Sequence, residues 1–210
     1  MNISIGCNIQ SGPFGGGNQL NRALADHFIQ LGHKVEFDLK SKDLDLIILV
    51  DPRTTLRSIS FGDKEILKYL LFSNSKTLVL QVIHECDERK GTSGLNERLW
   101  WANNIADHSV FISDWQHKLF LEKKLVFNND LVIRNGSDEK IFLWDGKPKW
   151  NGSSPLKLVT HHWSNNWMKG FDIYEKLDHM VKTEKWKNKI EFTYIGNVPN
   201  DFNFHNSKLV

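Results

Sequence analysis

The chain has 210 residues, with 27 Lys and Arg against 25 Asp and Glu, so its formal net charge is +2. Charged residues make up 25% and hydrophobic residues 40% of the sequence, which excludes a collagenous, coiled-coil or wholly disordered chain. The near-neutral balance gives no general electrostatic reason to expect nucleic acid as a partner. At roughly 150 residues per domain, the length corresponds to about one and a half domains.

The first two thirds of the chain alternate between β-rich runs and helical patterns. Strands are expected at residues 2–7, 34–37, 45–50, 77–83, 109–112 and 130–133. Helices are expected at residues 20–31, 66–71, 95–106 and 113–124, the last opened by a capping box of Ser113 and Gln116. This alternation predicts an α/β fold with a Rossmann-like, doubly wound parallel sheet.

The segment 147–155 breaks the alternation and is expected to be a linker. After it, residues 156–160 and 190–195 predict strands, and residues 172–181 predict a helix. We therefore expect a Rossmann-like domain over residues 1–146 and the incomplete start of a second Rossmann-like domain over residues 156–210. One strand–helix–strand unit is too little for an independent core.

The sequence also carries signals about the compartment. No apolar run approaches the roughly 18 residues of a membrane span, and the N-terminus lacks the pattern of a secretory signal. Cys7 and Cys86 form no CxxC motif, which is typical of reduced thiols in the cytoplasm. The basic group of Lys118, Lys123 and Lys124 is typical of a solvated helix face, or of peripheral contact with the inner face of an anionic membrane.

Polar and glycine-rich residues follow the expected strands. The carboxyl ends of parallel strands lie along one edge of a sheet, where ligands bind. The residues placed there include Gly15, Gly16, Gly17, Asn18, Asp51, Arg53, His84, Asp87, Asn135, His162, Lys169 and Gly170. This distribution predicts a ligand-binding cleft between the two domains.

The run Gly15, Gly16 and Gly17 allows a ligand to approach the backbone at a helix N-terminus. It lacks the Gly-Lys-Ser/Thr ending of a nucleotide P-loop, and Leu20 stands where a dinucleotide fingerprint has its third glycine. Asp38, about 20 residues further on, keeps an NAD(P)-type dinucleotide-binding protein as an alternative. A tight strand–helix turn in a non-catalytic binding module is a further alternative.

Several other residues each allow two interpretations. His84 ends a buried strand and fits either a structural hydrogen bond or a catalytic role. The acidic run 85–88 fits a solvated loop or a Mg²⁺ site, whereas the adjacent His161 and His162 are not typical of a zinc pair. Lys169 precedes a predicted helix N-terminus, which hints at phosphate unless it is an ordinary surface lysine. The large side chains Trp100, Trp101 and Trp115 are expected in the core.

Five motifs in order form a recognisable series: GPFGGGNQ (12–19), VIHECD (82–87), VFISDW (110–115), VIRNGSD (132–138) and MKGFD (168–172). The series resembles the retaining GT-B glycosyltransferases of family 4, the "glycosyl transferases group 1" class. That resemblance implies two Rossmann-like domains facing across a cleft. It implies transfer of a sugar from a nucleotide-sugar donor, UDP- or GDP-type, to a glycan or lipid-linked acceptor in polysaccharide biosynthesis.

The resemblance also assigns roles to residues. Gly15, Gly16 and Gly17 match the loop near the donor phosphates and the acceptor, and His84 matches the histidine that contacts the transferred sugar. Lys169 matches the lysine that neutralises the diphosphate leaving group. The further substrate-binding candidates are Asn18, Asp87, Asn135, His162 and Gly170. No metal or other cofactor is expected, because basic side chains and a helix N-terminus stabilise the departing charge.

The sequence departs from the family in two places. Ser164 stands where the family usually has Arg, and His162 is the candidate to share its phosphate role. The family's Glu-x7-Glu motif lies beyond the second strand of the C-terminal domain and is not contained in these 210 residues. We therefore expect the chain to be a fragment that transfers no sugar alone.

Overall fold

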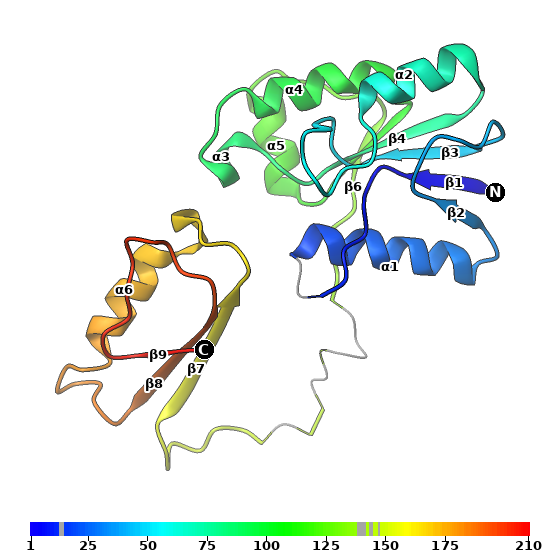
Figure 1. The fold of residues 1–210 in the computed structure, drawn as a ribbon. Coiled ribbons are helices and arrows are strands. Elements are labelled where there is room, and N and C mark those ends of the chain that lie inside the picture. The colour runs from blue at the N-terminus through cyan, green and yellow to red at the C-terminus, as the bar shows by residue number, and fades with distance from the viewer. Residues whose placement is uncertain (13–14, 138–141, 143–144, 147) are drawn as a thin grey trace. The chain divides into compact units, whose positions relative to one another are not determined.

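The structure is a computed structural model that describes residues 1–12, 15–137, 142, 145–146 and 148–210. It is an α/β structure that divides into two compact units, a first unit of Met1–Gly136 and a second unit of Ser137–Val210 (Figure 1). Each unit contains its own parallel sheet. This architecture is compatible with the expected Rossmann-like fold.

The first unit is built on a six-stranded sheet. Its strands are β1 (Asn2–Ile5), β2 (Lys34–Glu36), β3 (Leu46–Leu49), β4 (Leu78–Ile83), β5 (His108–Phe111) and β6 (Asp130–Val132). They lie in the order β2-β1-β3-β4-β5-β6, and every neighbouring pair is parallel. All six strands lie within a residue or two of the expected ranges, so the parallel α/β prediction is confirmed.

Helices cover both sides of this sheet. α1 (Gly16–Gln30) lies on one side, and α2 (Asp63–Phe72), α4 (Leu95–Ala102) and α5 (Asp114–Glu122) lie on the other (Figure 1). Alternate residues of β3 explain this division: Ile48 packs in the cluster beneath α1 with Ala25, whereas Ile47 packs with Ile66 of α2. The short α3 (Asp87–Lys90) and the 3-10 turn η1 (Asn103–Ile105) complete the layer.

The direction of the chain reverses beside β1. From β1 the chain passes through α1 to the edge strand β2, and it then returns past β1 to β3 on the other side. Loops therefore diverge at the carboxyl ends of β1 and β3, which opens the crevice where ligands bind in sheets of this kind. The loops that carry the glycine run and Asp51 begin at this point.

Three local expectations for the first unit are corrected. The helix expected through Ala106 ends at Ala102 and continues as η1. Ser113 Oγ accepts a bond from Gln116 N at 3.2 Å, but Gln116 Nε2 donates to Glu85 O at 2.7 Å, so Ser113 is an N-cap without a reciprocal capping box. Trp101 and Trp115 are exposed rather than in the core, because they lie on the outer faces of α4 and α5.

The second unit consists of three parallel strands and one long helix. Its elements are β7 (Leu156–His162), the 3-10 turn η2 (Trp167–Lys169), α6 (Phe171–Met180), β8 (Ile190–Gly196) and β9 (Lys208–Leu209). Contrary to expectation, it has a core of its own: four buried aromatic side chains, each contributing about 1.5–3 kcal/mol by burial. They are Phe171, Phe192, Tyr194 and Phe202.

Two glycines in this unit are required by their backbone positions. Gly170 has φ +93° and ends η2 while it opens α6. Gly196 has φ +119°, and a Cβ there would lie 2.3 Å from the carbonyl oxygen of His162. These positions bring the carboxyl ends of β7 and β8 together with the start of α6.

Candidate functional site

At the carboxyl end of β3, a buried carboxylate pairs with an arginine. Asp51 is 3% exposed and accepts bonds from Arg53 Nε at 2.9 Å and Arg53 Nη2 at 2.6 Å. The hydrogen bonds that Arg53 donates to Asp51 raise the pKa of Arg53, with smaller contributions from the charges of Glu85 and Asp87. Residues after β3 and after β4 therefore share one electrostatic environment.

His84 directly follows β4, the neighbour of β3. Its side chain is partly buried, and its carbonyl oxygen accepts a bond from Arg89 Nη1 at 2.9 Å. Burial lowers the pKa of His84, although Glu85 and Asp51 oppose that shift. The imidazole is thus neutral near pH 7. In this form one ring nitrogen donates a hydrogen bond and the other accepts one, so the ring can bind a hydroxyl group.

Asp87 organises the loop between β4 and α4. Its Oδ1 accepts bonds from Thr92 Oγ1 at 2.8 Å and Leu95 N at 3.1 Å, and its Oδ2 accepts one from Asn96 N at 2.9 Å. Burial opposes ionisation, but these bonds hold the pKa of Asp87 below its ordinary value. The carboxylate expected to bind substrate is therefore bound to the protein's own backbone.

The other acids of this loop are also paired. Glu85 lies 3.1 Å from Lys90 Nζ, and Glu88 lies 2.9 Å from Lys123 Nζ. In the part of the chain that the structure describes, no group of three or more His, Cys, Asp or Glu side chains could hold a metal ion. Lys123 thus neutralises an acid, which leaves less positive charge on α5 than the sequence suggested.

The glycine run forms the start of α1. Gly15 is the N-cap residue, and no side chain among the described residues caps the helix. Asn18 closes the preceding loop, because its Oδ1 accepts from Gln10 N at 2.8 Å and its Nδ2 donates to Gln10 O at 3.0 Å. Positions 13 and 14 of the GPFGGGNQ motif lie outside the described residues.

The three glycines are not required by the fold around them. A Cβ on Gly15, Gly16 or Gly17 would meet no described atom within 4 Å, and none of them has a positive φ. Glycine at a helical position costs about 0.5–1 kcal/mol relative to alanine. Gly16 and Gly17 therefore give up stability, and the run leaves an open helix N-terminus beside the crevice.

In the second unit, three of the predicted residues meet where β7 ends and α6 begins. His162 Nε2 lies 2.6 Å from the hydroxyl oxygen of Tyr174, which the sequence interpretation did not single out. Burial lowers the pKa of His162, and the positive charge of Lys169 lowers it further. Lys169 and Gly170 immediately precede the N-terminus of α6. A lysine and a helix N-terminus together favour an anion.

Asn135 lies three residues beyond β6 and is exposed. Nearby, Arg134 Nε lies 2.6 Å from Asp114 Oδ2 in an exposed ion pair. No helix of the described residues is long and apolar enough to cross a membrane.

The fold and these residues define an α/β protein with polar groups gathered at the carboxyl ends of its strands. In comparisons with known proteins, no family model matches the chain and no curated protein matches its sequence.

Proposed function

We propose that the protein is a retaining glycosyltransferase of the GT-B type that binds a UDP- or GDP-sugar and serves a glycan or lipid-linked acceptor. The observation that carries this proposal is the glycine run at the start of α1. Neither packing nor φ among the described residues requires glycine at Gly15, Gly16 or Gly17. A ligand that contacts the backbone there accounts for the absence of side chains.

The residues have distinct roles in this proposal. The sugar leaves the diphosphate of the donor, so negative charge grows on the departing oxygen. Lys169 and the N-terminus of α6 offset that charge, and His162, held by Tyr174, donates or accepts a hydrogen bond beside them. His84, neutral because of burial, contacts a hydroxyl of the transferred sugar.

An NAD(P)-type dinucleotide-binding protein is the second candidate. It is favoured by the position of Asp38, two residues after β2 at the same edge of the sheet as the glycine run. An acid at this position binds the ribose in dinucleotide-binding sheets. Asp38 pairs with Lys40 at 3.0 Å, and its side chain remains 48% exposed.

Calorimetric titration of the 210-residue chain separates the two candidates. We expect UDP- or GDP-sugars to bind and NAD to give no measurable heat. Lys169→Met should weaken nucleotide-sugar binding about tenfold, the loss of one charged hydrogen bond. Lys187→Met, in the exposed turn before β8, is the matched control and should bind as the wild type does. Tight NAD binding, or equal affinity in both lysine variants, would contradict the proposal.

A further inference from the structure

A pocket of the first unit lies at the carboxyl ends of β1 and β2, and neither the glycine run nor His84 is among its lining residues. It has a volume of about 700 Å³, within the range of small-molecule sites. Its lining comes from the loop after β1, the loop after β2 and the loop that leads from β3 to α2. The lining residues are Asn8, Glu36, Phe37, Asp38, Lys40, Ser41, Ile59 and Ser60.

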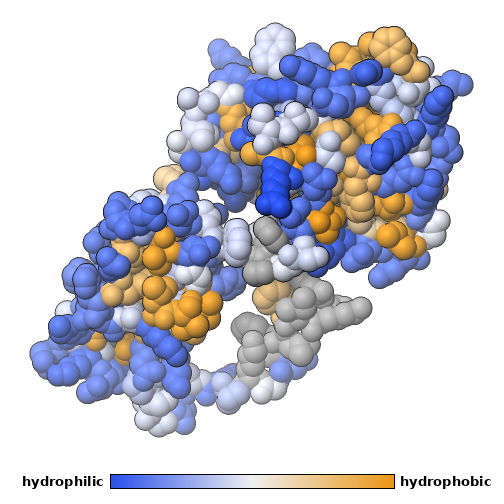
Figure 2. Space-filling view, viewed as in Figure 1, coloured by the Kyte–Doolittle hydropathy of each residue, from blue (hydrophilic) through white to orange (hydrophobic). Residues whose placement is uncertain are grey.

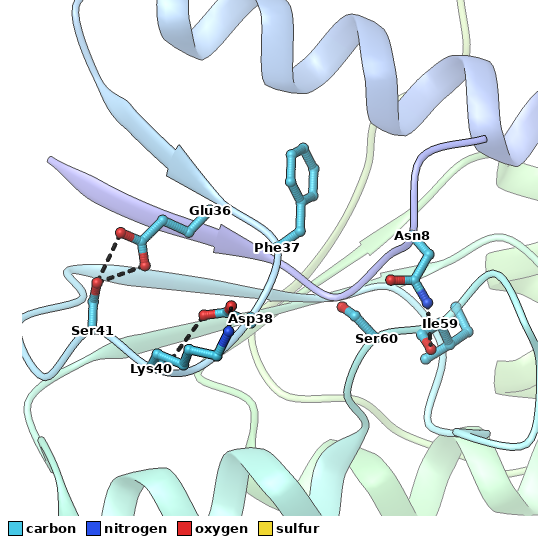
Figure 3. A pocket seen from close by; sticks show the side chains of 8 residues that line it. All are labelled: Asn8, Glu36, Phe37, Asp38, Lys40, Ser41, Ile59 and Ser60. Carbon is cyan, nitrogen blue, oxygen red and sulfur yellow. Dashed lines mark hydrogen bonds and ion pairs between the residues drawn. The ribbon is translucent and has the colours of Figure 1, made fainter. Parts of the chain in front are cut away.

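Hydrogen-bonding groups face each other across this pocket. Figure 3 shows Asp38 and Lys40 on one side and Asn8 and Ser60 on the other, with the ring of Phe37 pointing away toward α1. Asn8 uses its amide nitrogen to donate to Arg57 O at 3.0 Å and to Ile59 O at 3.2 Å. The side-chain Oδ1 of Asn8 accepts no bond from any described residue and is available to a ligand.

Ser60 carries a second unused group. Among the described residues, its Oγ is buried and has no hydrogen-bond partner. A buried hydroxyl without a partner costs about 1–3 kcal/mol. If the Ser60 side chain turns toward the pocket, a ligand hydroxyl between Ser60 and Asn8 would recover that cost, because the serine can donate or accept while the asparagine oxygen accepts.

The charges of the pocket exclude an anion and favour a neutral ligand. Glu36 is bound by Lys34 and Ser41, and these bonds lower its pKa. Asp38 pairs with Lys40, and its side chain remains 48% exposed, so it keeps free lone pairs as a carboxylate. With each carboxylate matched by one lysine, the pocket offers no excess positive charge to a phosphate.

We infer that this pocket binds the hydroxyl-rich ring of a neutral carbohydrate. Adjacent ring hydroxyls both donate and accept, which matches a carboxylate on one side and an amide oxygen with a serine hydroxyl on the other. Identifying the ring as part of the acceptor rests on the proposed function, whereas the recognition of a neutral sugar does not.

The test is a nuclear magnetic resonance titration of the full chain with methyl glycosides of glucose, galactose, mannose and N-acetylglucosamine. We expect at least one glycoside to give saturable shifts at the amides of Asn8, Asp38 and Ser60. Ser60→Ala should weaken that binding about fivefold or more, the effect of one hydrogen bond. Ser75→Ala, in the exposed turn after α2, is the matched control and should leave it unchanged.

Two further titrations distinguish a carbohydrate ring from the ribose of a nucleotide, because both ligands carry adjacent hydroxyl groups. NAD presents ribose hydroxyls, so shifts at these amides with NAD but with no glycoside would overturn the inference. Absence of saturable shifts with every glycoside, or equal affinity in the Ser60→Ala variant, would also overturn it. Titration with UDP- and GDP-sugars, followed by the amide shifts of Gly16 and Lys169, tests the proposed function separately. Glycoside binding without nucleotide binding would therefore refute the glycosyltransferase and leave the carbohydrate pocket standing.

Discussion

Asp51 and Arg53, two residues apart after β3, form an ion pair through two side-chain hydrogen bonds of 2.9 and 2.6 Å. Arg53 N also donates to Asp51 Oδ1 at 2.8 Å, so the same carboxylate holds the backbone of the turn. Because Asp51 is 3% exposed, its negative charge depends on Arg53 rather than on water. The pair thus fixes the loop that borders β4 and His84.

Replacing Arg53 by methionine should destabilise the first unit by about 3 kcal/mol. Removing one partner of a buried pair leaves an uncompensated charge, and the lower end of the usual range applies because Arg53 is 30% exposed. Urea denaturation measures the loss. The exposed pair of Arg134 and Asp114 provides the control, since Arg134→Met should cost much less where water screens the charges. Equal effects of the two variants would contradict the role assigned to burial.

The stability of the second unit should fall as the pH drops below about 6.5. Burial and Lys169 lower the pKa of His162, so the unfolded chain binds a proton more readily than the folded one does. Stabilisation is therefore complete above the unfolded pKa, near 6.5, and is lost progressively below it. Amide hydrogen exchange in β7 and β8, compared between pH 7.5 and 5.5, measures this change.

His162→Gln is the variant that isolates this effect. Glutamine does not titrate, so exchange in β7 and β8 should depend less on pH once intrinsic exchange rates are subtracted. Asp178, whose bonds to the 205–207 segment lower its pKa, loses its contribution only at more acidic pH and does not interfere in this range. An unchanged pH dependence in the variant would show that another group is responsible.

The sequence predicted the strands at the centre of the sheet. The apolar run of β3 is buried over its last three residues, where hydrophobicity alone indicates a strand, whereas in β4 buried residues alternate with partly buried or exposed ones. The polar residues that follow each strand also lie where the alternation placed them. By contrast, β9 has only two residues, Lys208 and Leu209, and exists through pairing with Thr193 and Tyr194 of β8.

Side-chain partners within the site could not be predicted, because they depend on tertiary packing. The bond between His162 and Tyr174 joins a strand end to a helix 12 residues later. The sequence predicted that Asp87 binds substrate, but its carboxylate oxygens accept hydrogen bonds from Thr92, Leu95 and Asn96 in its own loop. Helical spacing likewise placed Trp101 on one face of α4, but it did not indicate that this face is exposed to solvent.

Asn103→Ala should destabilise the first unit by about 2–3 kcal/mol. Asn103 is buried and donates to Gln81 Oε1 at 2.8 Å and Ser109 Oγ at 2.7 Å, while its own oxygen accepts from Asn128 N at 2.7 Å. Alanine would leave these buried groups without partners. The neighbouring Asn104→Ala is the control in the same urea experiment, because Asn104 is exposed and, among the described residues, its side chain donates only to Trp101 O. A loss below about 1 kcal/mol for Asn103→Ala would indicate that water replaces the amide.

Gly196→Ala should destabilise the second unit by about 3 kcal/mol or more. The new Cβ would lie 2.3 Å from the carbonyl oxygen of His162, and φ is +119°, a conformation that alanine rarely adopts. Gly136→Ala is a suitable comparison, because a Cβ there meets no described atom within 4 Å. Hydrogen exchange in β7 and β8 measures the loss, and equal protection in both variants would contradict the close contact between these strands.

Gly16→Ala separates stability from ligand binding at the start of α1. Gly16 is exposed, lies at a helical position and has open space around its Cα among the described residues, so alanine should stabilise the first unit by up to about 1 kcal/mol. If a nucleotide sugar contacts the backbone there, the added methyl group should at the same time weaken its binding about tenfold. Urea denaturation and calorimetric titration on the same preparation measure the two effects. A variant that is more stable and binds the nucleotide sugar with unchanged affinity would exclude the glycine run from the binding site, because the only change made is a methyl group at the surface the ligand is proposed to cover.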